Sequence, residues 1–142
     1  MSLNILFTAR AAANGGRDGH TKSDDGVVDV NLTSPSKRNA TGKNGTTPEH
    51  LFAAGYAACF ASACDYAARE MNLKPASIEV ETAVGMGQKD AGGFALKVDI
   101  NAKVGGLPRE DAEKLVTRAH EVCPYSNAVR NNVEVGVNVT TV

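Results

Sequence analysis

The pattern of apolar and polar positions along the chain predicts strands near both ends and two helices. The segment Phe94 to Val104 alternates with period two, as a strand with one buried face does. Residues 48 to about 71 and Pro108 to Val122 instead follow helical spacing. The remaining strand-like segments are Leu3 to Ala12, Gly26 to Leu32, Ser77 to Val84 and Val133 to Val142. The order β-β-α-β-β-α-β predicts an α+β domain with a sheet folded against two helices.

The first predicted helix has a clear start and an unusual surface. Thr47 suits the N-cap, Pro48 suits the first helical position, and Glu49 favours the positive end of the helix dipole. The first two-thirds of this helix is apolar on nearly every face. A helix of that kind must be surrounded by protein on most sides.

Two glycine-rich segments indicate turns, and a third segment indicates a longer loop. Asn14 to Gly19 (NGGRDG) predicts a hairpin tip that presents Arg17, because glycine adopts positive φ without steric cost. Gly92-Gly93 predicts a turn between two later strands, and Ser34 to Gly45 is rich in Pro, Asn and Gly and reads as a loop.

Length and charge narrow the class of protein. The 142 residues fit one domain over residues 1–142. The net charge is -1, and no run of Lys or Arg is longer than Lys37-Arg38, which argues against nucleic acid or an anionic membrane as a partner. The apolar stretch Leu51 to Cys64 is shorter than the roughly 20 residues of a membrane span. Met1 to Phe7 lacks the features of a signal peptide, so we expect a cytoplasmic protein.

Three cysteines are too few for a disulfide framework, but they allow a reactive pair. Cys59 lies mid-helix among small residues, and Cys64 lies about 140° around the helix and roughly 7.5 Å along it, too far for a disulfide. Cys64 is therefore expected to be a packing residue. Cys123 precedes Pro124 at a helix break, from which it can reach Cys59 if the two helices pack together. Three inert buried thiols are the alternative.

A reactive Cys59 needs a reason to be ionised, since free thiols titrate near pKa ~8.5 and burial raises the pKa. Arg17, at the glycine turn, is the candidate cation, because a guanidinium is always charged and can hold a thiolate and a carboxylate together. The alternative is an ordinary solvated loop arginine.

Three motifs give the chain a family resemblance. GGRDG surrounds Arg17, PEHLFAAGYAACF runs from Pro48 to Phe60, and HEVCPYSNA runs from His120 to Ala128. With these motifs in this order, the sequence resembles, nearly end to end, the organic hydroperoxide resistance proteins of the OsmC-like family. The resemblance implies an α+β fold with an antiparallel sheet wrapped around central helices in an intertwined homodimer.

The resemblance also implies a site and an activity. Cys59 matches the peroxidatic cysteine, Cys123 the resolving cysteine, and Arg17 and Glu49 the activating pair. Family members are cytoplasmic peroxidases for alkyl and fatty-acid hydroperoxides in the response to oxidative stress. They need no metal, flavin or haem, and a dihydrolipoyl dithiol, free or on a lipoylated protein, reduces them. The chain departs from the family pattern at His50, where a glutamine is expected, and at Cys64.

Helix geometry adds an expectation about assembly. Glu49 and Cys59 are ten positions apart, which corresponds to roughly 15 Å along one helix. Glu49 therefore cannot touch the thiol of its own subunit. If Arg17 and Glu49 act at Cys59, we expect them to come from the partner chain of a dimer.

Other functions remain open at this point. A cysteine-dependent acyl-transfer enzyme would pair a cysteine with His20, His50 or His120. A redox-responsive or lipid-binding module would use the same small residues around Cys59 without turnover. A zinc site on His120 and Cys123 lacks two further evident ligands.

Overall fold

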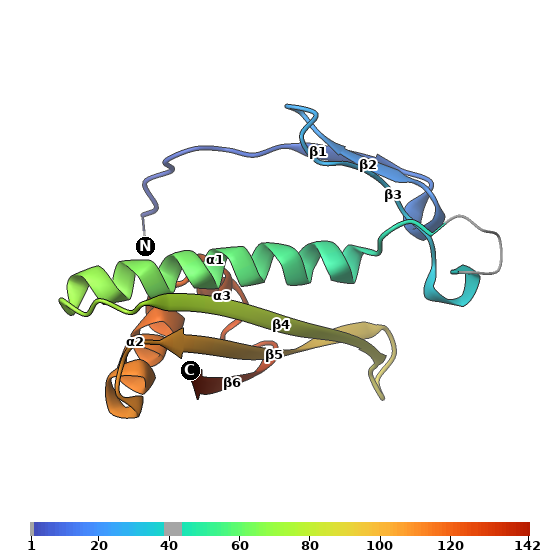
Figure 1. Ribbon diagram of the computed structural model, residues 1–142. Helices are drawn as coiled ribbons and strands as arrows, with labels where there is room; N and C mark the ends of the chain where they lie inside the picture. Colours follow the sequence, from blue (N-terminus) through green and yellow to red (C-terminus); the bar gives the residue numbers. More distant parts are fainter. Residues whose placement is uncertain (1, 39–43) are drawn as a thin grey trace. The chain divides into compact units, whose positions relative to one another are not determined.

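The computed structural model describes residues 2–38 and 44–142 of the chain (Figure 1). The chain divides into two compact units, Met1–Leu51 and Phe52–Val142. The sequence-based expectation of one domain over residues 1–142 stays a prediction. The predicted loop Ser34 to Gly45 lies partly outside the described residues.

The first unit holds a three-stranded antiparallel sheet in the order β1-β2-β3. Its strands are β1 (Ala11–Asn14), β2 (His20–Ser23) and β3 (Asp29–Asn31). A 3-10 turn at Gly16–Asp18 joins β1 to β2, and the preceding Gly15 has φ of 76°, a conformation that glycine adopts without strain. The predicted hairpin with Arg17 at its tip is confirmed.

The strand predictions for this unit were only partly right. The strand expected at Leu3 to Ala12 begins at Ala11, and β2 (HTKS) went unpredicted. β2 has no apolar alternation, although it pairs with both β1 and β3. Leu3, Ile5, Leu6 and Phe7 are 62% to 88% exposed, and residues 3–10 have no strand partner among the described residues.

The second unit is a sheet covered by helices on one face. The helix α1 (Pro48–Glu70) begins before the boundary of the units and continues through the second, as predicted. It is followed in chain order by β4 (Ser77–Gln88), β5 (Phe94–Gly105), α2 (Arg109–Val122), α3 (Pro124–Val129) and β6 (Glu134–Thr141). In Figure 1 the green helix α1 runs alongside β4, and the Thr82 hydroxyl donates to the Ala53 carbonyl at 2.7 Å.

The sheet of the second unit is mixed, which corrects the expectation of an antiparallel sheet. Its order is β4-β5-β6, with β4 and β5 antiparallel but β5 and β6 parallel. The parallel pair arises because α2 and α3 form a crossover that returns the chain to the end of the sheet where β5 began. The short helix α3 was also unpredicted, so the observed order is β-β-β-α-β-β-α-α-β.

Alternation along β5 divides the sheet into an apolar and a polar face. Val98, Ile100 and Ala102 are fully buried, whereas the side chains between them are polar. The buried positions form one core with the inward faces of α1 and α2, including Phe60 and Leu115. In the described part of the chain, no helix is long and apolar enough to cross a membrane.

The turn that carries Arg17 depends on a glycine with no room for a side chain. A Cβ added at Gly19 would overlap the Asn14 carbonyl oxygen and lie 2.7 Å from the Gly15 Cα. We therefore expect Gly19→Ala to lower the free energy of unfolding by about 1–3 kcal/mol, measured by urea denaturation. Gly87→Ala is the matched control, because a Cβ there would meet none of the described atoms within 4 Å. Equal unfolding midpoints for the two variants would contradict the expectation.

Candidate active site

Cys59 and Cys123 lie side by side in the second unit. Cys59 is on α1, Cys123 is at the junction of α2 and α3, and their Sγ atoms are 3.7 Å apart. Both thiols are free; Cys123 is fully buried and Cys59 is partly buried. A disulfide needs an S–S length of about 2.05 Å, so a small movement would bring these sulfurs into bonding distance. The predicted proximity of the pair is confirmed.

The proline after Cys123 creates the corner that presents this thiol. Pro124 has no backbone N–H and disfavours helical geometry at the residue before it. Accordingly α2 ends at Val122, Cys123 has φ of -63° and ψ of 123°, and Pro124 begins α3 at a position that suits proline.

A small residue on α1 lets this corner come close. A Cβ added at Gly55 would lie 3.1 Å from the Tyr125 hydroxyl and 3.2 Å from its ring. The small residue at position 55 therefore permits close approach of the corner to α1 near Cys59.

Within this chain the pKa of Cys59 is raised. Burial is the largest cause, and the neighbouring Cys123 thiol also raises this pKa. The backbone N–H of Tyr125 donates to the sulfur and lowers the pKa, but by less. No cationic group among the described residues shifts the pKa of Cys59. The net effect of these groups is to favour the neutral Cys59 thiol.

Arg17 and Glu49 form a bidentate ion pair in the first unit. Arg17 Nη1 donates to Glu49 Oε2 at 2.7 Å, and Nη2 donates to Oε1 at 2.5 Å. This pair holds the pKa of the Glu49 carboxyl below its usual value, chiefly through the hydrogen bonds from Arg17. The side chain of Arg17 stays 42% exposed, so the guanidinium remains open to a further partner. The structure thus confirms that the two predicted residues are paired.

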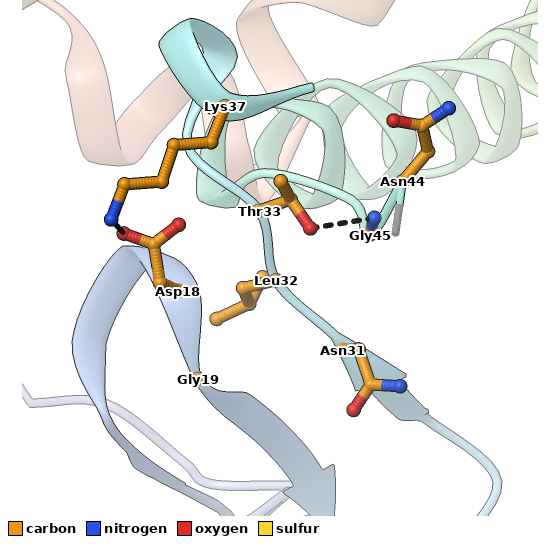
Figure 2. Close-up of a pocket in the computed structure, with 8 residues that line it drawn as sticks. All are labelled: Asp18, Gly19, Asn31, Leu32, Thr33, Lys37, Asn44 and Gly45. Atoms are coloured by element: carbon orange, nitrogen blue, oxygen red, sulfur yellow. Dashed lines mark hydrogen bonds and ion pairs between the residues drawn. The ribbon is translucent and has the colours of Figure 1, made fainter. Parts of the chain in front are cut away.

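Asp18 links the turn that carries Arg17 to the segment at Ser34 and Lys37. Its carboxylate accepts hydrogen bonds from the Ser34 backbone N–H at 2.9 Å, the Ser34 hydroxyl at 2.8 Å and Lys37 Nζ at 3.3 Å. Figure 2 shows Asp18 facing Lys37 at a cavity of about 740 Å³. The lining of this cavity contains none of the four predicted site residues. The contacts of Asp18 therefore support the Arg17 turn and do not form part of the candidate site.

Sequence reasoning missed a hydrogen-bond chain beside the two cysteines. The Tyr56 hydroxyl is 2.7 Å from Ser126 Oγ, and this oxygen is 2.8 Å from His120 Nδ1. Tyr56 and Ser126 are fully buried. The only signal in the sequence is that Ser126 and His120 each lie three positions from Cys123.

Each histidine has a partner other than cysteine. His20 Nε2 is 2.5 Å from an Asp29 oxygen, His50 Nδ1 is 2.7 Å from the Thr47 hydroxyl, and His120 meets Ser126. A Cys–His nucleophile is therefore not supported. Among the described residues there is also no group of three or more His, Cys, Asp or Glu that could hold a metal.

Cys64 lies in the core, as expected for a packing residue. It is fully buried, and burial is the main cause that raises the pKa of its thiol to about 12. The neutral thiol is a poor nucleophile.

Comparison with known proteins decides the family. Residues 40–138 match the family described as OsmC-like protein. The chain belongs to this family. It is 44% identical over 132 residues to the organic hydroperoxide resistance protein of Xanthomonas axonopodis pv. citri (strain 306), with 92% of each chain covered. It is 47% identical over 131 residues to the organic hydroperoxide resistance protein OhrB of Bacillus subtilis (strain 168), with 92% of this chain and 95% of OhrB covered.

The solved structures agree with the expected fold. The crystal structure of OhrB from Bacillus subtilis matches with a TM-score of 0.90 at 45% identity, covering 96% of this chain and 100% of OhrB. An organic hydroperoxide resistance protein from Legionella pneumophila matches with a TM-score of 0.89 at 41% identity, covering 96% and 99%. The predicted α+β, OsmC-like fold is confirmed.

The position of His120 generates a prediction about pH. Burial and the nearby Arg130 lower the pKa of His120 below its usual 6.5, and Arg109, Glu113 and Glu121 line the same cavity. Because the unfolded chain binds a proton more readily at this site, the free energy of unfolding should fall as the pH drops below about 6.5. Urea unfolding between about pH 7.5 and pH 5 should show a weaker pH dependence in His120→Asn than in the unchanged protein. Identical pH dependence in both proteins would show that His120 does not contribute.

Proposed function

We propose that this protein is a thiol peroxidase that reduces organic hydroperoxides to alcohols and protects the cell from oxidative stress. The observation that carries the proposal is the 3.7 Å separation of the free Cys59 and Cys123 sulfurs. The relatives named organic hydroperoxide resistance proteins, at 44% and 47% identity, support the choice of substrate class.

The reaction begins and ends with this pair of sulfurs. The Cys59 thiolate attacks the distal oxygen of the hydroperoxide, the O–O bond breaks, and the alkoxide takes up a proton to leave as an alcohol. Cys59 is then a sulfenic acid. The Cys123 thiol attacks its sulfur, a disulfide forms, and the hydroxyl leaves as water with the Cys123 proton. An external dithiol reduces the disulfide by two exchange steps.

Cys59 is the peroxidatic member because of its exposure. It is partly exposed, whereas Cys123 is fully buried behind it. A bulky hydroperoxide can therefore reach Cys59 first. Cys59 packs against the same apolar cluster as Phe52 and Phe60, and such surroundings favour alkyl or fatty-acid hydroperoxides over the small polar hydrogen peroxide.

The activating charge in this proposal comes from a second copy of the chain. Glu49 and Cys59 lie ten positions apart on one unbroken helix, which corresponds to roughly 15 Å of helix axis. Arg17 is held by Glu49, and no cation of the described chain contributes to the Cys59 pKa. An Arg17–Glu49 pair from the partner subunit would place a guanidinium at the thiolate, which would lower the Cys59 pKa.

Exposed apolar surface supports a homodimer. Leu3, Ile5, Leu6 and Phe7 form an apolar run near the N-terminus that is 62% to 88% exposed. Tyr66 on α1 and Phe94 at the start of β5 are also half or more exposed. Contact with a second copy would remove such surface from water.

The reductant in this proposal is a dihydrolipoyl dithiol, either free or on a lipoylated protein. A dithiol suits a partly buried disulfide, because its second thiol completes the exchange within one encounter. The chemistry above uses sulfur alone and needs no bound cofactor. Because such a cycle depends on reduced dithiols, the cytoplasm is the compartment that fits it.

Mass spectrometry after one equivalent of cumene hydroperoxide tests the proposal. We expect a loss of two hydrogens and a Cys59–Cys123 disulfide, because these sulfurs are 3.7 Å apart. Cys64→Ser should give the same product, since burial keeps that thiol neutral. Cys123→Ser should reduce one equivalent of peroxide but fail to turn over with dihydrolipoamide.

A binding module or a hydrolase would behave differently. With either, both thiols would stay reduced and no hydroperoxide would be consumed. That result would reject the peroxidase.

The shared site is tested by complementation between an impaired variant and an inactive one. Arg17→Ala should lower the reaction rate by about tenfold or more, because loss of a nearby cation raises a thiol pKa by one unit or more. Cys59→Ser should have no activity.

In a mixed dimer, the Arg17→Ala chain supplies Cys59 and the Cys59→Ser chain supplies Arg17. If the site is shared, a refolded equimolar mixture should recover about a quarter of wild-type activity, since half of the dimers hold one complete site. A mixture no more active than Arg17→Ala alone would place all four residues in one chain. Arg10→Ala is the control, since Arg10 also lies in the N-terminal segment but outside the turn.

A further inference from the structure

Three side chains form a hydrogen-bond chain around the corner that holds Cys123. Tyr56 on α1 and Ser126 on α3 meet at 2.7 Å between hydroxyl oxygens, and His120 on α2 meets Ser126 at 2.8 Å. The hydroxyl residues are fully buried and His120 is partly buried. The peroxidase reaction proposed above uses none of them.

Each of these three residues lies three positions from one of the two cysteines. Tyr56 lies three positions before Cys59 on α1, and Ser126 lies three positions after Cys123. The Tyr56–Ser126 hydrogen bond therefore joins α1 to α3 about one helical turn from the point where the sulfurs meet. His120 lies three positions before Cys123, so its bond to Ser126 ties together the two sides of the corner.

The corner needs such support because its backbone supplies little. α3 has only six residues, too few to be stable as an isolated helix. Pro124 also contributes no backbone N–H. A further contact closes the corner: Arg130 Nη2, just after α3, donates to the His120 carbonyl oxygen at 2.5 Å.

The chain of donors and acceptors is complete when His120 is neutral and carries its proton on Nε2. The Ser126 hydroxyl then donates to His120 Nδ1, and the Ser126 oxygen accepts from the Tyr56 hydroxyl. Every proton of the two buried hydroxyls has an acceptor. Loss of either hydroxyl or of the imidazole would leave a buried polar group without its partner.

We propose that Tyr56, Ser126 and His120 are positioning residues for the resolving step, which keep Cys123 against Cys59 so that disulfide formation outpaces over-oxidation. The inference rests on the proposed peroxidase function. The Cys59 sulfenic acid has two fates: attack by the Cys123 thiol gives a disulfide and water, and reaction with a second hydroperoxide gives sulfinic acid and an alcohol. The position of Cys123 sets the rate of the first fate only.

The test compares these two products in Ser126→Ala and in the unchanged protein. Each is treated with increasing excesses of cumene hydroperoxide, and mass spectrometry measures the ratio of Cys59–Cys123 disulfide to Cys59 sulfinic acid. Loss of one net hydrogen bond corresponds to roughly a fivefold change in a local equilibrium, so we expect this ratio to fall roughly fivefold. Both products arise from the same sulfenic acid, so the ratio does not depend on how fast that acid forms.

Matched variants separate positioning from general destabilisation. Thr117→Ala removes a hydroxyl from an exposed position of α2 and should leave the ratio unchanged. The double variant Tyr56→Phe/Ser126→Ala removes both hydroxyls, so it has no buried Tyr56 hydroxyl without a partner, as Ser126→Ala has. Its unfolding midpoint should therefore exceed that of Ser126→Ala, while its product ratio stays low. His120→Asn offers an oxygen acceptor near Nδ1 and should keep a near-normal ratio, whereas His120→Leu should behave like Ser126→Ala.

Three outcomes are decisive. An unchanged product ratio in Ser126→Ala overturns the positioning role. A normal ratio in the double variant also overturns it, because the effect of Ser126→Ala would then come from a stranded hydroxyl. An unchanged protein that forms no disulfide at all would instead overturn the proposed function, and this result is visible before any variant is made.

Discussion

The packing of the α2–α3 corner against α1 is the contact on which the chemistry depends. A single proline ends α2, turns the backbone at Cys123 and starts α3 in a new direction. This change of direction brings a fully buried thiol to 3.7 Å from a thiol 64 positions earlier in the chain. Cysteine pairs are common in proteins, but a free pair held this close by two helices and a proline is suited to reversible disulfide chemistry.

Burial and charge oppose each other at Cys59. In the proposed enzyme the apolar core around the pair would favour an apolar substrate, yet the same burial raises the pKa of the Cys59 thiol. The Tyr125 backbone N–H offsets only part of this effect. The first unit carries an exposed guanidinium whose orientation is fixed by Glu49. In the proposed enzyme, one part of the fold supplies the reactive sulfurs and another supplies the charge that ionises one of them.

The sequence predicts those parts of this molecule in which local signals and tertiary packing agree. α1 and α2 have helical spacing and good ends, and the glycine turn around Arg17 needs residues that tolerate positive φ, so these elements were found. The strand His20–Ser23 was missed because its residues follow no alternation. The parallel pairing of β6 was missed because strand direction depends on the path of α2 and α3, which no local pattern encodes. The Tyr56–Ser126 contact joins residues 70 positions apart and gave no signal. The roles of Arg17 and Glu49 came from resemblance, whereas their pairing is visible in the structure.

Cys59 and Cys64 are five positions apart on one helix, yet their sulfurs lie in different surroundings. The Cys59 sulfur lies at the α2–α3 corner, 3.7 Å from the Cys123 sulfur. The Cys64 sulfur lies in the core, where burial is the main cause that raises its pKa to about 12. Alkylating reagents applied to the native protein would consequently undercount its cysteines.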